Sequence, residues 1–356
     1  MINIGDVARK AGVSPATVSR VINNTSPVRE ETRDRVLKAI KDCNYMPNVA
    51  ARNLSTQNSL NNIGLVIPDA DNPFFLSILR GVTLTADQYH YNTLLFNTDE
   101  NPNREHRFLK TVLDQNLKGI IIIPLSERDE ETQASLMELE SVGVPVVLVD
   151  RRIGDLDFDG IYSDDEKDAF QAVEALIAAG HTRIATIAGP QRSTPGMARL
   201  LGYQRAMESH GLSIPPEYIA YGDFKFDGSR AAAEQLLSLD NPPTAIFTAN
   251  VFSTLGLLAC LSDRGLQIGK DISLIGFDAV PPWLHVLTRP GQSVGLSLVE
   301  RPEEQMAREA VELLQSRIRD GQYRDSARKR LILSNRLVLR GSETMPALLH
   351  PQGDRI

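Results

Sequence analysis

The sequence is short of the residues that would mark a disulfide framework, a metal site or a membrane span. Its 356 residues include two cysteines, Cys43 and Cys260, which lie far apart and fit neither a metal-binding nor a disulfide pattern. No apolar run approaches the ~20 residues that a transmembrane helix requires. The first residues also lack the apolar stretch and the cleavage site of a signal peptide. We therefore expect a cytoplasmic protein that has no contact with a membrane.

Motifs that would indicate an enzyme or a bound cofactor are missing as well. The chain has no G-x-G-x-x-G after a strand, no G-x-x-x-x-G-K-[ST] and no H-E-x-x-H. The acidic run SDDEKD at 163–168 stands where a helix is expected to begin, so its charges suit the helix dipole better than a metal ion. We therefore expect no enzyme activity, no cofactor and no metal. The histidines are scattered without a close pair: His90, His106, His181, His210, His285 and His350.

Charge is unevenly distributed along the chain. The net charge of −7 combines residues 1–60, which carry nine Lys/Arg and five Asp/Glu, with a remainder that carries 29 Lys/Arg and 40 Asp/Glu. A first segment with a net charge of +4 on a body with −11 favours a polyanionic partner for the first segment alone.

Residues 4–43 have the apolar spacing of three short helices. After the first, Gly12 suits the left-handed position that ends a helix, Ser14 suits an N-cap, and Pro15 suits the first helical position. The second helix has one narrow apolar side, so its other faces are polar. A third helix over about 30–43 is expected to bury Val36, Leu37, Ile40 and Cys43.

A short helix, a glycine turn and a second helix with a polar outer face form the pattern of a helix-turn-helix. On this interpretation the second helix faces a DNA groove, where Arg20 can bind guanine O6 and N7. The alternative is an ordinary three-helix cap on the rest of the chain. The residues expected to bond phosphate oxygens are Ser14, Thr17 and Ser19, and those expected at base edges are Pro15, Ala16 and Arg20.

From residue 61 the sequence alternates continuous apolar runs with helical segments. Such runs are typical of parallel strands buried on both faces, and the alternation indicates βαβ units in doubly wound sheets. The number of strands suggests two α/β lobes, with chain crossings near 160, 290 and 325. The apolar runs cover 63–68, 92–97, 119–124, 145–150, 183–189, 244–249 and 271–278.

Three stretches carry a specific resemblance to a known family. They are IGDVARKAGVSPATVSRVINN, VREETRDRVLKAIKDCNYMPNVAARNLST and IGLVIPDADNPFF. Over nearly its whole length the chain resembles the lactose-repressor (LacI) family of bacterial transcription regulators. The resemblance implies a helix-turn-helix headpiece, a hinge helix and a two-lobed core similar to a periplasmic sugar-binding protein. In that family the core dimerises and binds a small effector between its lobes.

The resemblance also assigns roles to the segment after the headpiece. Asn48 to Ser55 match the hinge helix, in which Asn48 and Ala51 are expected to contact DNA, and Leu54 matches a leucine that wedges into the minor groove at the operator centre. A small apolar wedge can separate the stacked bases of a single step in bent DNA; the alternative for Leu54 is a linker leucine packed on the core. A short isolated helix is unstable in water, so the hinge is expected to order on DNA.

The expected domain boundaries follow from these patterns. The end of the chain has no leucine heptad, so no tetramer formed through the tail is expected. The expected segments are 1–47 for the headpiece, 48–60 for the hinge helix and linker, 61–341 for the core and 342–356 for a flexible tail. Within the core we expect an N-lobe over 61–160 and 290–322 and a C-lobe over 161–289 and 323–341.

The effector is expected in the crevice at the carboxyl ends of the strands, between the lobes. Amide and carboxylate groups there can bond hydroxyls, aromatic rings can stack on a sugar, and arginines can bind an anion. For Trp283 a core position is an equal alternative, and for Lys225 a solvated one. The expected lining residues are Phe74, Arg151, Arg199, Asn250 and Asp278 by resemblance, together with Lys225 and Trp283.

Two departures from the family pattern bear on the ligand. Val251 follows Asn250 where relatives commonly have an acid, and Ala279 follows Asp278 where a second acid is frequent. The loss of two acids beside basic residues favours an anionic effector, such as a sugar acid or a sugar phosphate. The segment FDxxPPW also resembles the branch of the family associated with gluconate and ketogluconate.

The sequence therefore predicts a homodimeric, DNA-binding repressor of a carbohydrate or sugar-acid operon, which reads a near-palindromic operator. Its effector would shift the core between states that do and do not bind DNA. Two other classes remain as alternatives: a solute-binding protein, or an α/β enzyme that acts on a sugar, neither with sequence-specific DNA binding. The sequence does not predict the effector itself or whether it induces or co-represses.

Overall fold

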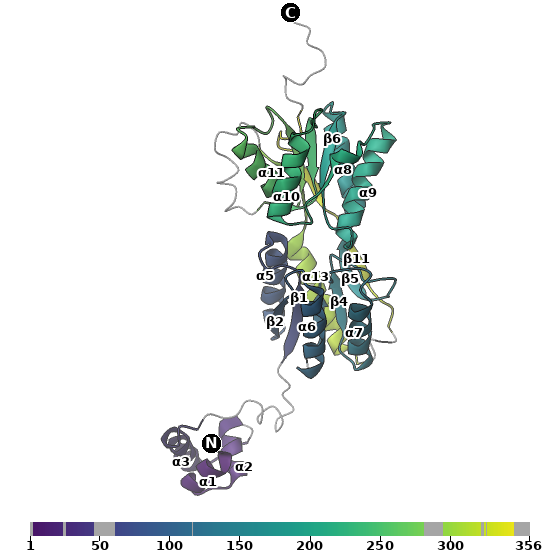
Figure 1. Cartoon of the computed structure of the whole chain (residues 1–356). Helices are drawn as coiled ribbons and strands as arrows, with labels where there is room; N and C mark the ends of the chain where they lie inside the picture. The colour runs from purple at the N-terminus through teal and green to yellow at the C-terminus, as the bar shows by residue number, and fades with distance from the viewer. Residues whose placement is uncertain are drawn as a thin grey trace, which may run out of the picture. The chain divides into compact units, whose positions relative to one another are not determined.

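The computed structural model describes residues 3–23, 26–45, 61–115, 117–280, 295–321, 324 and 326–344. The chain divides into two compact units, Met1–Leu60 and Asn61–Ile356 (Figure 1). In these described ranges, no helix combines the length and the apolar composition needed to cross a membrane.

Within residues 3–23 and 26–45, the first unit contains three packed helices, as the sequence predicted. Asn3 and Asp6 form a capping box at the start of α1, and Gly12 ends α1 with φ +65°. Ser14 Oγ accepts a hydrogen bond from Thr17 N at 3.2 Å, so it caps α2. The helices are α1 (Ile4–Ala11), α2 (Pro15–Asn23) and α3 (Glu30–Asp42).

Of the four residues expected in the core from the third helix, Leu37 is the one that the structure exposes, while Ile40 and Cys43 are partly buried. Val36 is fully buried, but the side chain of Leu37 is 50% exposed. Successive residues of a helix point about 100° apart, so the neighbour of a central core residue turns toward solvent. Ala39 takes the inward position instead. Arg29, at the N-cap of α3, makes no capping hydrogen bond with its side chain.

The second unit consists of two lobes, each built on a sheet with six strands among the residues that the structure describes. The N-lobe sheet has the order β11-β5-β4-β3-β1-β2 and is parallel throughout. The C-lobe sheet has the order β12-β10-β9-β8-β6-β7, with β12 as its antiparallel edge. The N-lobe strands are β1 (Asn62–Ile67), β2 (Asn92–Asn97), β3 (Ile120–Ile122), β4 (Val146–Val149), β5 (Asp159–Ser163) and β11 (Arg330–Leu333). The C-lobe strands are β6 (Ile184–Ala188), β7 (Ile219–Tyr221), β8 (Ala245–Thr248), β9 (Ser273–Phe277), β10 (Ser297–Glu300) and β12 (Arg336–Val338).

Helices cover the sheets in pairs that pack against each other (Figure 1). In the N-lobe α5 packs with α13 and α6 with α7; in the C-lobe α8 packs with α9 and α10 with α11. This is the doubly wound arrangement that the alternation of runs predicted. The helices are α5 (Pro73–Gln88), α6 (Pro102–Asp114), α7 (Glu130–Ser141), α8 (Asp165–Ala178), α9 (Thr194–Ser209), α10 (Phe226–Leu237), α11 (Val251–Asp263) and α13 (Glu303–Arg319), with a short 3-10 helix η1 (Pro216–Tyr218).

The chain passes between the lobes three times. Two segments lie in the opposite lobe from the one predicted for them. β10 belongs to the C-lobe sheet, although 290–322 was expected in the N-lobe. β11 pairs with β5 in the N-lobe sheet, although 323–341 was expected in the C-lobe. Each crossing takes only a few residues, so no long linker marks the change of lobe in the sequence. α13 lies in the N-lobe, as expected.

The carboxyl ends of the N-lobe strands face the C-lobe. The residues that follow β1 and β4 contact residues that follow β7 and β6. Parallel sheets place their ligand sites at these strand ends. The surface where the two lobes meet is called the lobe interface below.

Candidate effector site and DNA-binding helix

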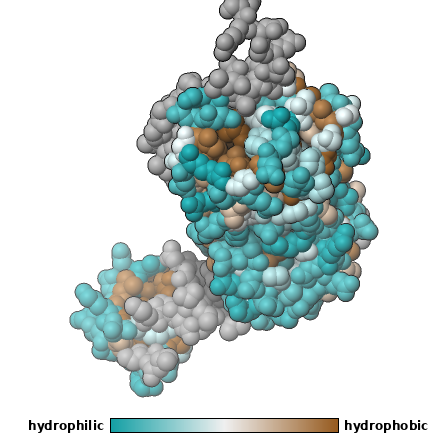
Figure 2. Space-filling view, turned by 45° about the horizontal axis from the view of Figure 1, so that its top comes forward, coloured by the Kyte–Doolittle hydropathy of each residue, from teal (hydrophilic) through white to brown (hydrophobic). Residues whose placement is uncertain are grey.

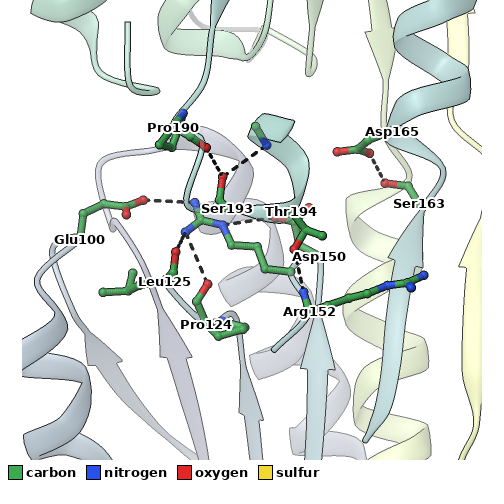
Figure 3. Close-up of polar contacts among 12 residues, drawn as sticks. Glu100, Pro124, Leu125, Asp150, Arg152, Ser163, Asp165, Pro190, Ser193 and Thr194 are labelled. Carbon is green, nitrogen blue, oxygen red and sulfur yellow. Dashed lines mark hydrogen bonds and ion pairs between the residues drawn. The ribbon is translucent and has the colours of Figure 1, made fainter. Parts of the chain in front are cut away.

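Arg151 follows β4 and lies buried at the lobe interface. Its side chain is 3% exposed and its Nη2 lies 3.1 Å from Glu100 Oε1. Its Nη1 donates to the carbonyl oxygens of Pro124 and Leu125, both at 3.5 Å (Figure 3). Its guanidinium also lies 5.6 Å from the ring centroid of Phe75. Three strand ends therefore hold this arginine in place.

Arg199 on α9 is the second buried arginine, and it binds within the C-lobe. Its Nη2 lies 2.9 Å from Asp165 Oδ2 on α8, and its Nη1 donates to the carbonyl of Ala249 at 2.5 Å. The guanidinium packs 3.8 Å from the ring centroid of Phe277. The acidic run at 163–168 thus supplies a partner for Arg199 as well as the cap of α8, since Asp164 accepts from Lys167 N.

Asn250 and Asp278 follow β8 and β9, and their polar atoms differ in availability. Asn250 caps α11: its Oδ1 accepts from the backbone and the hydroxyl of Ser253, both at 2.8 Å. Asp278 has a left-handed backbone, with φ +70°. Its Oδ1 is buried without a hydrogen-bond partner among the described residues. Asp278 is therefore the better placed of the two to bind a ligand.

Phe74 and Lys225 complete the predicted residues that the structure describes in this region. Phe74 lies in the first turn of α5, 4% exposed, and the Arg301 guanidinium lies 4.1 Å from its ring centroid. Lys225 bridges the lobes, with Nζ 2.5 Å from Asp69 Oδ2. Its side chain is 43% exposed, so this pair is at the rim of the interface. Trp283 lies outside the described residues.

A continuous chain of ion pairs runs through the lobe interface. Eight side chains alternate in sign, and the members from Arg199 to Arg151 are nearly inaccessible to solvent. In order, the chain is Asp165, Arg199, Asp278, Arg301, Asp150, Arg151, Glu100 and Arg192. Four carboxylates therefore face four guanidinium groups, and the Lys225–Asp69 pair adds one charge of each sign.

Five of the eight side chains in this chain of ion pairs were not among the predicted lining residues. Asp150 and Arg301 form its centre, and Glu100 lies between Arg151 and Arg192. Phe224, which is 8% exposed, was also not predicted; its ring centroid lies 5.6 Å from the Arg199 guanidinium. Their positions in the sequence could have indicated these residues, because several of them directly follow a strand, where a parallel sheet places its ligand site.

Burial and neighbouring charges shift the pKa values at the centre of the chain in different directions. Burial raises the pKa of Asp278, although Arg199 and Arg301 oppose the shift. At Asp150 burial also acts to raise the pKa, but Arg301 and its neighbours hold the pKa below its usual value. Asp150 is thus firmly ionised, whereas Asp278 is the easier of the two to protonate.

The lobes also touch through contacts outside the ion-pair chain. Arg152 N donates to Thr194 Oγ1 at 3.0 Å (Figure 3), and Glu127 N donates to the carbonyl of Arg192 at 3.2 Å. Ser193 Oγ, which caps α9, fixes the turn before Thr194 by donating to the carbonyl of Pro190 at 3.0 Å. The turn after β6 is therefore fastened to the N-lobe on two sides.

In the first unit, α2 presents a polar face. Pro15, Ala16 and Arg20 are exposed, and Thr17 and Ser19 are partly exposed, while Val18 and Val21 are buried against α1 and α3. Ser14 Oγ lies 3.0 Å from Thr17 Oγ1. The side chains predicted to meet DNA thus share the outer side of one helix. Asn48, Ala51 and Leu54 lie outside the described residues.

Comparison with known families decides between the predicted classes. Residues 3–48 match "Bacterial regulatory proteins, lacI family", and residues 60–320 match "Periplasmic binding proteins and sugar binding domain of LacI family". The chain belongs to the LacI family. It is therefore a DNA-binding transcriptional repressor with an effector-binding core, and not an enzyme, as the sequence predicted.

Relatives of this LacI-family chain resemble it over nearly its whole length. It is 35% identical over 342 residues to the ribose operon repressor of Escherichia coli K12, and the match covers 96% of this chain and 100% of that one. A "transcriptional regulator CelR-cellobiose complex" is 28% identical, with a TM-score of 0.68 and coverage of 96% and 100%. The lac repressor dimer bound to operator and the anti-inducer ONPF is 25% identical, with a TM-score of 0.74 and coverage of 96% and 99%.

Proposed function

We propose that this repressor binds an uncharged sugar or sugar derivative at the lobe interface and controls a carbohydrate-utilisation operon. The observation that carries the proposal is the balance of charge at the interface, where each buried arginine has a carboxylate partner. A buried site that is already neutral favours a neutral ligand, since an added charge would lack a counter-charge. The names of the ribose operon repressor and of the CelR–cellobiose complex support the sugar class.

Three buried polar atoms suit such a ligand. Arg151 Nε, Arg301 Nε and Asp278 Oδ1 have no hydrogen-bond partner among the described residues. Buried polar atoms are seldom left unpaired. Two donors and one acceptor match a sugar, whose hydroxyls both accept and donate hydrogen bonds. We propose that the effector pairs these three atoms.

The sugar-acid effector predicted from the sequence has weaker support. That prediction counted Arg151, Arg199 and Lys225 as free cations near two lost acids. The three cations instead bind Glu100, Asp165 and Asp69. The remaining argument for an anion is that Arg151 Nε and Arg301 Nε are both donors, and a carboxylate can bridge two such groups.

A thermal-shift panel on the full-length protein tests the ligand class. The panel pairs each neutral sugar with its acid: D-ribose with D-ribonate, and D-glucose with D-gluconate, with D-glucose 6-phosphate added. A ligand at a hundred times its dissociation constant adds ~2.7 kcal/mol of stability, or roughly 5–10 °C for a core of this size. Shifts with neutral sugars alone would support the proposal, and shifts confined to acids or phosphates would contradict it.

We further propose that α2 reads the operator and that two copies of the chain bind a near-palindromic site. The residues that would contact phosphates and base edges are the exposed Ser14, Pro15, Ala16 and Arg20 and the partly exposed Thr17 and Ser19. A two-fold dimer presents two such helices, so the half-sites mirror its symmetry. The similar lac repressor, solved as a dimer bound to its operator, supports this arrangement.

Exposed apolar side chains indicate where the dimer would form. Leu76 and Leu84 on α5 are 41% and 56% exposed, and Leu95 on the edge strand β2 is 43% exposed. In the C-lobe, apolar residues gather on the face that carries α10 and α11 (Figure 2), where Leu255 and Leu258 are only partly buried. Apolar side chains that gather on the surface of a folded core favour a protein partner, and we propose a second copy.

A further inference from the structure

Arg301 joins the two halves of the ion-pair chain. It stands where the chain crosses from β10 to α13, and its side chain is 1% exposed. Its Nη2 binds Asp150 in the N-lobe and donates to Ser163 Oγ at 3.1 Å. Its Nη1 lies 3.7 Å from Asp278 Oδ1 in the C-lobe. One guanidinium therefore serves a carboxylate from each lobe.

Charge at the centre of the interface depends on this one side chain. Burial alone would lower the pKa of Arg301, but Asp150, Asp165 and Asp278 raise it further above its usual value, so the group stays charged. Among the described residues, the other ion-pair partner of Asp150 is Arg151, with Nε at 3.9 Å, and Arg151 already binds Glu100; Arg199 acts on Asp150 from farther away. Without Arg301 the interface would hold one uncompensated negative charge, which is costly when buried.

The packing around Arg301 fixes its orientation. Its guanidinium lies over the Phe74 ring at 4.1 Å from the centroid, and the Ser163 hydrogen bond holds Nη2. The Nε atom remains without a partner among the described residues. Arg301 thus presents one buried donor in a set direction while both terminal nitrogens neutralise the acids.

We propose that Arg301 determines effector specificity, because its charge balances Asp150 and Asp278 and so makes the lobe interface accept neutral sugars and reject their acids. This inference rests on the sugar effector proposed above. It adds that the discrimination between a sugar and its acid is set by the net charge of this cluster, with Arg301 as its central residue.

A charge series in the full-length protein tests the inference. Arg301→Gln makes the cluster more negative by one charge, Asp150→Asn makes it more positive by one, and the double variant restores the balance. Dissociation constants for D-ribose and D-ribonate, and for D-glucose and D-gluconate, are measured by calorimetry at one salt concentration. A circular-dichroism spectrum and a melting curve of each variant confirm that the core is folded.

The ratio of the two dissociation constants in a pair is the decisive quantity. We expect the wild type to prefer the neutral member, and Arg301→Gln to bind that member at least about 10-fold more weakly, as for a buried charge pair that loses one partner. Asp150→Asn should shift the ratio toward the acid by about 10-fold, and the double variant should return the ratio to within about threefold of the wild type. A role in packing alone would leave the ratio unchanged across the series.

Two results would overturn the inference, and they can be told apart. In the first, the wild type binds the neutral sugar, and all three variants have the same ratio of dissociation constants for sugar and acid as the wild type. Arg301 then does not determine specificity, while the proposal of a sugar effector stands. In the second, the wild type binds neither the sugars nor their acids but still binds operator DNA. The proposal of a sugar effector is then wrong, and so is the proposed role of Arg301 in selecting it.

Discussion

Arg199 of α9 and Asp165 of α8 form a buried ion pair, with Nη2 and Nε at 2.9 Å and 3.0 Å from the same carboxylate oxygen. The pair ties two helices that pack closely in the C-lobe. The same guanidinium packs on Phe277 at the end of β9 and donates to the carbonyl of Ala249 after β8. One side chain thus connects two helices to two strand ends.

Replacing Arg199 should therefore destabilise the core as well as affect any ligand. Arg199→Met leaves Asp165 buried beside Asp278 without their shared cation, and breaking a buried pair in this way costs about 3–5 kcal/mol. Unfolding by urea, followed by circular dichroism, measures the change in the free energy of unfolding. The matched control is Arg205→Ala on the same helix, where the arginine and Glu166 are 61% and 31% exposed; there we expect less than about 1 kcal/mol. Equal losses at the two positions would show that the Arg199 pair contributes no more than a surface pair.

Arg20→Ala should weaken operator binding and relax the base preference. A bidentate arginine contact with guanine is worth about 1–3 kcal/mol of discrimination, so affinity for an operator selected from a random DNA pool should fall by that amount at fixed salt. Arg9, on α1 with its side chain 83% exposed, is the control. Arg9→Ala should lower binding to all sequences alike, if at all. An unchanged base preference in Arg20→Ala would remove Arg20 from base recognition.

The stability of the N-lobe should depend on pH through Glu105. This carboxyl on α6 is fully buried; its two oxygens accept from Thr132 Oγ1 at 2.7 Å and Leu125 N at 3.0 Å. Burial raises its pKa to about 7, although both hydrogen bonds oppose the shift. The folded protein therefore keeps this proton at pH values where the unfolded chain has lost it.

The sign of the effect follows from the raised pKa. Below about pH 4.5 the group adds its full stability, and this contribution is lost as the pH rises toward 7, up to about 3 kcal/mol in all. Urea unfolding of the wild type and of Glu105→Gln at pH 5 and pH 7.5 measures it. The variant should lose less stability than the wild type between these two values. Parallel pH profiles for the two proteins would contradict the raised pKa.

Leu84→Glu should weaken the dimer without unfolding the core. Leu84 is 56% exposed on α5, so a charge there has little folding cost but would be desolvated in an interface. Sedimentation velocity of the full-length protein should show a larger monomer fraction at the same concentration. Met137→Glu on α7, a helix that packs with α6, is the control, since Met137 is 55% exposed as well. Equal monomer fractions in the two variants would show that the dimer interface does not include Leu84.

The Lys225–Asp69 pair should add little to stability although it joins the two lobes. Lys225 is 43% exposed, so solvent screens the pair, and exposed pairs contribute about 0–1 kcal/mol. A double-mutant cycle with Lys225→Met and Asp69→Asn, read by the melting temperature, measures the coupling. The coupling should fall as salt increases. A coupling above about 2 kcal/mol that is independent of salt would mean that the pair is effectively buried.

The sequence predicted the regions of the fold that have a strong local pattern. The apolar runs at 63–68 and 119–124 became β1 and β3, which are buried on both faces. By contrast β11 is largely exposed and β7 has three residues with one exposed end, so in each the apolar run is only three residues long and too short to mark a strand. Short edge strands of this kind are defined by pairing with a distant segment, which periodicity does not report.

The sequence predicted where the candidate site lies in the core, but it did not predict which acids and bases pair there. Arg151, Arg199 and Asp278 do lie together at the strand ends. Their partners come from elsewhere: Arg301 is 151 residues from Asp150 in the sequence. A spacing rule can place a residue at the end of a strand, but it does not show which acid lies opposite which base across two lobes.

The three crossings between the lobes bear on how the protein can be divided. The N-lobe needs α13 and β11 from the end of the chain to cover and extend the sheet that β1 to β5 begin. The C-lobe sheet needs β10, which precedes α13 in the sequence, and β12, which follows β11. A cut at the first crossing thus separates β11 from the rest of the N-lobe sheet, a cut at the last separates β12 from the C-lobe sheet, and a cut at the second leaves both sheets incomplete. Neither lobe could be produced alone as a continuous fragment, and a truncation before residue 297 would remove the central ion pair of Arg301 together with a strand or helix from each lobe.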